Sequence, residues 1–202
     1  MTDPVSVVFL VDDDPPVRRA IQRLVESVGL QVENFDSAQE FLQAKRPDVP
    51  GCLVLDIRLS GVSGLDFQQQ LVEAKIHIPV IFITAQGDIP MRVETLKAGA
   101  VEFLTMPFRD QDLLDSIRSA LAKDRARRQL EAEITELRAR FELLTPGERE
   151  VLTMVVSGMV NRQIAAEIGA DENTVQGSSQ SRGEEDAGTI PGRPDEIETK
   201  AL

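Results

Sequence analysis

Four residues of this 202-residue chain could together carry phosphoryl chemistry. Asp12 and Asp13 follow the first short apolar run, Asp56 follows the third, and Thr84 ends the fourth. Crowded carboxylates repel one another unless a divalent cation neutralises them, and a site made only of oxygen ligands suits Mg2+. A carboxylate beside that ion can act as a nucleophile toward a phosphoryl group, and a threonine hydroxyl can donate to a phosphoryl oxygen. We therefore predict a Mg2+ site at the three acids and an aspartyl phosphate beside it.

Short runs rich in β-branched residues alternate with amphipathic stretches and would position these side chains. The periodicity predicts strands over residues 5–11, 30–35, 52–55, 79–84 and 101–104 and helices over 16–28, 37–45, 64–74, 88–98 and 109–122. Strands that alternate with helices form a parallel sheet covered on both faces, and its ligands bind beyond the carboxyl ends of the strands. The acids should meet at that edge. We also expect Asp14 to cap the first helix and Cys52 to be buried as a small apolar residue.

The composition is that of a globular protein without a membrane segment. An apolar share of 42% is enough for a hydrophobic core, and no apolar run reaches the roughly 18 residues that a membrane span needs. The first residues contain no basic region, so we expect a cytoplasmic protein. A net charge of -12 by itself opposes binding to nucleic acid.

Five short motifs occur in the first part of the chain: VDDD at 11–14, LDIRLSGVSG at 55–64, ITAQGD at 83–88, KAGAVEFL at 97–104 and PF at 107–108. In this combination, residues 1–122 resemble the receiver domain of two-component response regulators. The resemblance implies an α/β flavodoxin-like fold with five parallel strands in the order 2-1-3-4-5. It also implies phosphorylation by a sensor histidine kinase.

The resemblance assigns a role to each residue at the sheet edge. Asp12 and Asp13 match the acidic pair that holds Mg2+, Asp56 matches the phosphoacceptor, and Arg58 matches a position whose backbone carbonyl is a metal ligand. Such a receiver catalyses only its own phosphorylation and dephosphorylation, so we do not expect an enzyme that acts on another substrate. A phosphatase of the haloacid-dehalogenase type also uses an aspartate and Mg2+, but its nucleophile follows the first strand, whereas Asp56 follows the third.

The family pattern also includes a pair of switch residues, and the sequence departs from the pattern at two other positions. Thr84 and Phe103 match the hydroxyl and the aromatic ring that respond to phosphorylation in the family. Ser60 stands where the family usually has proline, which we expect to loosen a loop. Met106 stands where the family has a lysine that pairs with the phosphorylated aspartate, a contact worth roughly 1.5–3 kcal/mol. Methionine has no donor, so coupling of the phosphate to the switching face should be weakened. The bond before Pro107 is cis in the family.

A charged run without glycine or proline extends from 109 to 142. Within it and just beyond, apolar residues recur at spacings of four and three: Leu130, Ile134, Leu137, Phe141 and Leu144. This spacing fits either a short coiled coil or a helix that lies against a neighbour. In both cases we expect residues 123–143 to form a helical linker that continues the last receiver helix.

The segment after the linker is predicted to be a helix-turn-helix region. Thr145 and Glu148 have the spacing of a capping box, and Gly169 stands where a helix C-cap is expected. A third helix should begin near Asp171, and in a helix-turn-helix the last helix enters the DNA major groove. The residues LTPGEREVLTMVVSGMVNRQIAAEIGADENTV resemble the LuxR-type DNA-binding domain, and the pairing with this receiver is similar to the FixJ subfamily. The resemblance makes Asn161, Thr174 and Val175 candidate DNA contacts.

The character of the chain changes abruptly after Val175. Residues 176–202 contain six acidic and three basic residues among Gly, Ser and Pro, a composition typical of disorder. In the family, basic residues that contact DNA and a further helix follow at this point. Read one nucleotide later, the codons of Gln176-Gly177 must encode Lys or Arg, so a frameshift near codon 176 is one hypothesis. A tail that evolved as it stands is the alternative, and resequencing separates the two.

We therefore expect a receiver domain at 1–122, a helical linker at 123–143, a partial LuxR-type domain at 144–175 and a disordered tail at 176–202. The family role is phosphorylation-dependent control of transcription by a DNA-binding homodimer. A receiver that accepts a phosphoryl group but no longer binds DNA is the alternative function, because specific DNA binding needs a basic docking face.

Overall fold

The computed structural model describes residues 6–85 and 99–169, and the chain divides into two compact units at residues 1–134 and 135–202. The helix predicted over 88–98 and the one expected near Asp171 lie outside the described residues, as do Thr174, Val175 and the tail. Among the helices of the described residues, none is long and apolar enough to cross a membrane.

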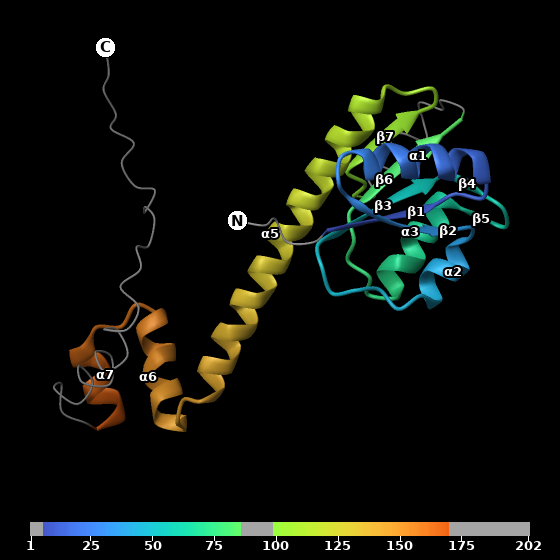
Figure 1. The fold of residues 1–202 in the computed structure, drawn as a ribbon. Helices are drawn as coiled ribbons and strands as arrows, with labels where there is room; N and C mark the ends of the chain where they lie inside the picture. The colour runs from blue at the N-terminus through green and yellow to red at the C-terminus, as the bar shows by residue number, and fades with distance from the viewer. Residues whose placement is uncertain (1–5, 86–98, 170–202) are drawn as a thin grey trace, which may run out of the picture. The chain divides into compact units, whose positions relative to one another are not determined.

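The first unit is built on a parallel sheet. Its strands in the described residues are β1 (Val7–Val11), β2 (Gln31–Phe35), β3 (Gly51–Asp56), β6 (Val80–Thr84) and β7 (Glu102–Thr105). Their order across the sheet is β2-β1-β3-β6-β7, and every neighbouring pair is parallel (Figure 1). This is the order 2-1-3-4-5 of the five predicted strands, so the flavodoxin-like topology is confirmed.

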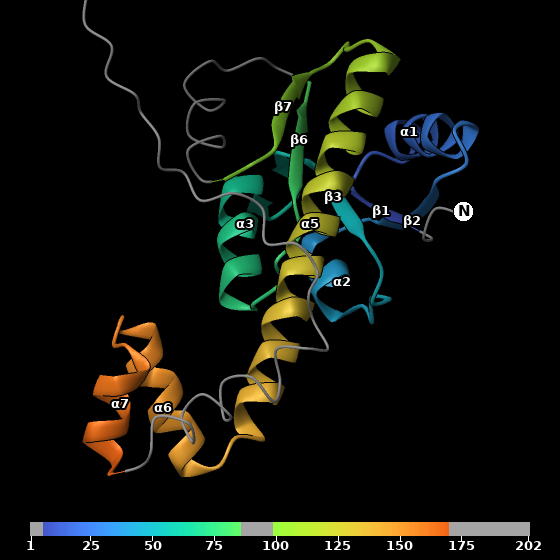
Figure 2. The ribbon, with the colours of Figure 1, turned by 90° about the vertical axis from the view of Figure 1, so that its left-hand side faces the viewer.

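Helices cover both faces of this sheet. They are α1 (Pro15–Ser27), α2 (Ala38–Gln43), α3 (Gly64–Glu73) and the long α5 (Asp110–Glu142). Apolar residues of α1 and α5 pack on one face and those of α2 and α3 on the other, and Figure 2 shows α3 and α1 on opposite sides of the strands. On the α2 face the Phe41 ring meets three other phenylalanine rings, at centroid distances of 5.2–5.9 Å and nearly edge-on. Each such contact adds about 0.5–1.5 kcal/mol beyond the burial of area.

Two of the sequence expectations concern single residues near the first helix and the third strand. Cys52 is fully buried in the core, as predicted. Asp14 is the N-cap residue of α1, as predicted, but its side chain makes no capping hydrogen bond. Instead, its backbone N–H donates to Oδ1 of Asp12 at 2.7 Å.

A short hairpin that the periodicity did not predict follows β3. Its antiparallel strands are β4 (Arg58–Leu59) and β5 (Val62–Ser63), and Gly61 between them has a φ of 94°, which favours glycine. At the start of α3, a Cβ on Gly64 would lie 2.8 Å from Cα of Ile57, so only glycine fits. The hairpin thereby folds the chain after Asp56 back over the carboxyl edge of the sheet.

A buried aspartate on α5, Asp124, connects this helix to the start of β3. Asp124 is 1% exposed, and its Oδ2 accepts from the backbone N–H of Gly51 at 3.0 Å and from Nε of Arg128 at 2.7 Å. Its Oδ1 accepts from Nη2 of Arg127 at 2.6 Å. Arg128 also pairs with Asp48. Burial alone raises the pKa of Asp124, but the bonds from Arg127, Arg128 and Gly51 bring it below the usual value. The helix is therefore tied to the amino-terminal edge of the sheet.

The second unit contributes two described helices, α6 (Pro146–Val156) and α7 (Asn161–Ile168). Thr145 and Glu148 form the predicted capping box, and Gly169 ends α7 in the left-handed conformation at a φ of 65°. Ile164 and Ala165 are the buried residues of its described core. The core of this part is therefore small compared with that of the receiver unit.

Candidate functional site

Three carboxylates converge at the carboxyl edge of the sheet. Asp12 and Asp13 follow β1 and Asp56 ends β3, and one oxygen of each lies within 4.8 Å of the others. β1 and β3 pair in parallel from Val7 opposite Gly51 to Val11 opposite Leu55, and this register brings the ends of the two strands together. The predicted convergence of the three acids is thus a feature of the fold.

The Asp12 carboxylate lies in an environment that disfavours its charge. Its residue is 1% exposed. Burial is the main cause that raises the pKa of Asp12 to about 6, and the negative charges of Asp56, Asp13 and Asp14 add to it. The N–H of Asp14 works in the opposite direction but does not cancel the effect.

The Asp56 carboxylate is affected in the same direction. Burial first, and then the charge of Asp13, raise the pKa of Asp56, although the backbone N–H groups of Arg58 and Ile57 oppose the shift. The Arg58 N–H donates to Oδ1 of Asp56 at 3.2 Å. Among the described residues, no Arg or Lys side chain forms an ion pair with Asp12, Asp13 or Asp56.

Asp13 has a partner that the sequence did not reveal. Both the backbone N–H and the hydroxyl of Ser60 donate to Oδ2 of Asp13, the former at 3.0 Å. A proline at this position could make neither bond. Ser60 therefore does more than loosen a loop, because it ties the β4–β5 hairpin to the acid cluster.

A second residue that the sequence analysis did not single out is Arg18 of α1, which donates from Nη1 to the backbone carbonyl of Asp12. A basic residue one helical turn after an acidic strand end is common, so its role could not be read from spacing. The contact fixes the chain where β1 passes into α1.

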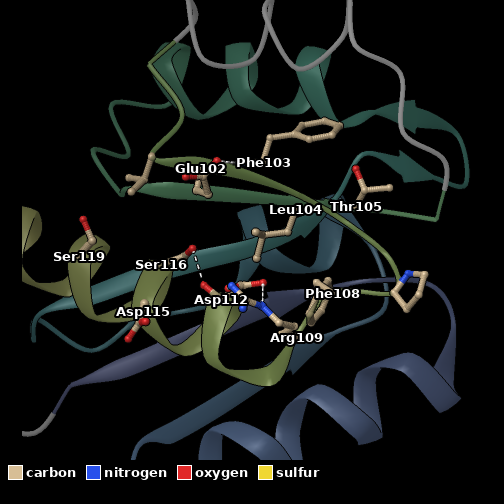
Figure 3. A pocket seen from close by; sticks show the side chains of 12 residues that line it. Glu102, Phe103, Leu104, Thr105, Phe108, Arg109, Asp112, Asp115, Ser116 and Ser119 are labelled. Carbon is tan, nitrogen blue, oxygen red and sulfur yellow. Dashed lines mark hydrogen bonds and ion pairs between the residues drawn. The ribbon is translucent and has the colours of Figure 1, made fainter.

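The two predicted switch residues lie on neighbouring strands. Thr84 ends β6, is 1% exposed and pairs with Thr105 in the sheet register. Phe103 is 4% exposed and belongs to the core on the α2 and α3 side. Figure 3 shows the side chains of Phe103 and Leu104 on opposite sides of β7, as the alternation of a strand requires.

Met106 directly follows β7 and lies beside Thr84 on the neighbouring strand. Its backbone N–H donates to the carbonyl of Thr84 at 2.7 Å, and the Met106–Pro107 bond is cis. The side chain is half-buried. The position adjoins the site, and its thioether provides no positive charge there.

The donor set fits a hard divalent cation. Three carboxylates whose oxygens lie within 4.8 Å of one another, two of them with raised pKa, are the pattern expected where a positive ion would relieve the repulsion. Backbone carbonyls near the cluster could complete the shell, and Arg58 is the sequence-based candidate for one of them.

In the second unit, one of the three candidate DNA contacts lies in the described residues. Asn161 is the first residue of α7 and is half-buried. Four apolar side chains nearby are exposed: Leu152, Val155, Val156 and Val160. No residue of α6 is buried. This part of the chain therefore presents apolar surface rather than a basic face among its described residues.

Two family comparisons agree with these features. Residues 8–118 match the response regulator receiver domain, and residues 142–180 match the luxR family of bacterial regulatory proteins.

Individual relatives cover most of the chain. The chain is 51% identical over 171 residues to nodulation protein W of Bradyrhizobium diazoefficiens, covering 85% of this chain and 75% of that protein. It is 39% identical over 177 residues to the transcriptional regulatory protein FixJ of Rhizobium meliloti, covering 87% and 85% respectively. Among solved structures, the response regulator StyR matches with a TM-score of 0.75 and 45% identity over 87% of this chain and 89% of that one.

Proposed function

The chain belongs to the response regulators of two-component systems, with a receiver domain and a LuxR-type region, and from this we propose that Asp56 is its phosphoacceptor. Response regulators of this kind control transcription. The observation that carries the proposal is the convergence of Asp12, Asp13 and Asp56, which form no ion pair with a basic side chain of residues 6–85 and 99–169. Such an arrangement favours a bound cation and, beside it, a carboxylate that can take up a phosphoryl group.

Asp12, Asp13 and Asp56, with the carbonyl of Arg58, would hold Mg2+. The ion would supply positive charge to the cluster and to the phosphoryl oxygens. One Asp56 oxygen attacks phosphorus, the new O–P bond forms as the bond to the donor breaks, and the donor leaves with the electron pair. The donor in the cell is a histidine of a sensor kinase. Hydrolysis of the acyl phosphate returns the carboxylate, and these are the only reactions that we assign to the protein.

Thr84 and Phe103 would transmit the phosphorylated state. The Thr84 hydroxyl donates to a phosphoryl oxygen, and Phe103 occupies the inward position in its core cluster. The surface that follows is the groove between β7 and the start of α5, where Arg109 pairs with Asp112 at 2.5 Å (Figure 3). We assign this face to a phosphorylation-dependent homodimer. Because Met106 adds no cation, the coupling is weaker than a lysine would give.

The DNA-binding role is the less complete part of the proposal. The LuxR-type match supports operator DNA as the family's target. The exposed apolar residues of α6 support an output region whose described part presents apolar rather than basic surface. A receiver that accepts phosphate but binds DNA feebly is therefore the second candidate function, and the tail after Val175 with its frameshift hypothesis would explain it.

Incubation with Mg2+ and acetyl phosphate, followed by intact mass measurement, tests the phosphoacceptor. We expect one added phosphate that is absent from the Asp56→Asn variant and from samples with excess chelator. Uptake by Asp56→Asn, or uptake that ignores the chelator, would contradict the assignment.

A gel shift with operator DNA at moderate salt separates the two candidate functions. Specific nanomolar binding by the phosphorylated 202-residue chain would favour the transcriptional role of this form. Binding that stays weak and independent of sequence would favour the phosphoryl-accepting receiver.

A further inference from the structure

An apolar stripe runs along one side of α5, after the helix has left the sheet. Leu130, Ile134 and Leu137 are 57%, 39% and 62% exposed, and Phe141 continues the row at 43%. Charged and polar residues occupy most of the remaining surface of this part of the helix. Leu144, the fifth residue of the sequence pattern, lies beyond the end of the helix at Glu142 and is half-buried. The stripe on α5 therefore consists of four residues.

We propose that this stripe pairs with the same stripe of a second copy of the chain, as a short parallel two-stranded coiled coil. Its core positions alternate between Leu at 130 and 137 and Ile at 134. A β-branched residue at one core position with Leu at the other favours two parallel strands. Two copies of this helix can therefore pair through identical stripes, without a different partner protein.

The charges beside the stripe specify the same partner and orientation. In a parallel pair, the residue before one core position faces the residue five places later on the partner helix. Here Glu133 would face Arg138 of the second copy, and by symmetry the contact occurs twice. Within one chain, Glu133 accepts only from the neutral Gln129, at 2.8 Å, and Arg138 forms no ion pair among the described residues. Both charges are thus available to a second copy.

Ion pairs within α5 immediately precede the stripe. Arg127, one turn before Leu130, is engaged with Asp124 and with Glu131 at 2.7 Å. Ion pairs continue beside the apolar row, where Arg140 pairs with Glu136 at 2.7 Å, but none of these pairs involves Glu133 or Arg138. Because the row spans fewer than two heptads, the pairing is weak by itself, and linkage through any other contact between two copies would strengthen it.

Single-cysteine cross-linking tests the pairing directly, because Cys52 is buried and serves as a silent background. In the full chain, Ile134→Cys and Leu137→Cys should each give a disulfide-linked dimer under mild oxidation. Ala139→Cys, on the outer side of the same helix, should cross-link at least tenfold more slowly. Equal rates at the three positions, or no dimer at Ile134→Cys and Leu137→Cys, would overturn the proposal. An antiparallel pair would link at most one of the two core positions.

Charge reversal in the Leu137→Cys background tests the orientation. Glu133→Arg should slow the cross-linking several-fold, and adding Arg138→Glu should restore it. A double variant as slow as the single one would contradict the parallel register. The pairing does not require phosphorylation, so without a phosphodonor adding Asp56→Asn should leave the rate unchanged, whereas failure of the proposed function would appear only as absent phosphate uptake.

Discussion

Asp12 and Asp124 are equally buried, each 1% exposed, but they lie at opposite ends of the sheet in opposite electrostatic surroundings. The Asp124 carboxylate accepts hydrogen bonds from two arginine side chains and a backbone N–H, and its pKa is below the usual value. Asp12 faces other carboxylates, and its pKa is raised to about 6. Asp124 is compensated by basic side chains, whereas the Asp12 carboxylate has no basic side-chain partner in the part of the chain that the structure describes.

The difference separates a structural acid from one that we propose to be functional. A buried charge whose partners all belong to the chain gains nothing from a ligand, and removing it leaves those partners unpaired. A carboxylate cluster that has no basic partner among the described residues stays folded at a cost, which a cation would relieve. This contrast in compensation, more than the presence of acids, supports the proposed reactive site at the carboxyl edge.

The largest effect is expected from Asp124→Asn. The substitution removes the charge and places an amide donor toward groups that already donate, so the free energy of unfolding should fall by roughly 2–4 kcal/mol. Denaturant titration measures it. Asp115→Asn on the same helix breaks an exposed pair with Arg118 and should change stability by less than about 0.5 kcal/mol.

The pH dependence of that loss checks its cause. Since the pKa of Asp124 is lowered in the folded state, its contribution is complete above the unfolded value of about 3.9 and disappears as pH falls through the lower folded value. The gap between wild type and Asp124→Asn should therefore be constant near neutral pH and shrink below about pH 4. A gap that persists unchanged into that range would point to packing rather than charge.

Met106→Lys would place a positively charged side chain beside the acid cluster, comparable to the arginines that pair with Asp124. If the lysine reaches the phosphorylated aspartate, the dimer equilibrium should shift by about 1.5–3 kcal/mol, roughly ten- to hundredfold. Sedimentation with and without acetyl phosphate measures it. Met106→Gln, of similar length but neutral, is the control. Unchanged phosphorylation-dependent dimerisation in the lysine variant would show that this position does not limit the coupling.

Asp12→Asn should have the opposite sign to Asp124→Asn. Without Mg2+ it should raise the free energy of unfolding by about 1–2 kcal/mol, because a buried charge beside Asp13 and Asp56 is removed while its oxygen can still accept from Asp14. Thermal unfolding with and without Mg2+ provides the measurement. Wild type should gain stability when the ion is added, and the variant should gain much less. A variant less stable than wild type without the ion would contradict the view that the cluster is uncompensated.

The sequence predicted one end of the sheet far better than the other. Strand ends follow from local periodicity, so Asp12, Asp56 and Thr84 could be brought to one edge before any coordinates were known. Asp124 looked like one more charge on an amphipathic helix, because its burial depends on Gly51, which lies 73 residues earlier. Contacts of that separation leave no periodic signal.

Local reasoning did not predict the hydrogen bonds of two loop residues at the acid site. Asp14 occupies the predicted N-cap position, but its side chain makes no capping bond and its backbone N–H donates to Asp12. The bond between Ser60 and Asp13 depends on the turn at Gly61, and the amino-acid pattern did not predict that hairpin. Hydrogen bonds made by irregular segments therefore had to come from the structure.

Ser60→Ala is expected to have the smallest effect. It tests how much a neutral hydroxyl donor stabilises a carboxylate of the acid cluster, compared with the arginines at Asp124. The variant keeps the backbone donor to Asp13 and loses the hydroxyl, so stability without Mg2+ should fall by about 0.5–1 kcal/mol. A double-mutant cycle with Asp13→Asn measures the coupling, because the hydroxyl makes a stronger hydrogen bond to a charged carboxylate than to a neutral amide. Added Mg2+ should reduce the loss, since the ion then neutralises the same carboxylate. A loss that is identical in the Asp13→Asn background would mean that Ser60 acts on the hairpin alone and not on the acid cluster.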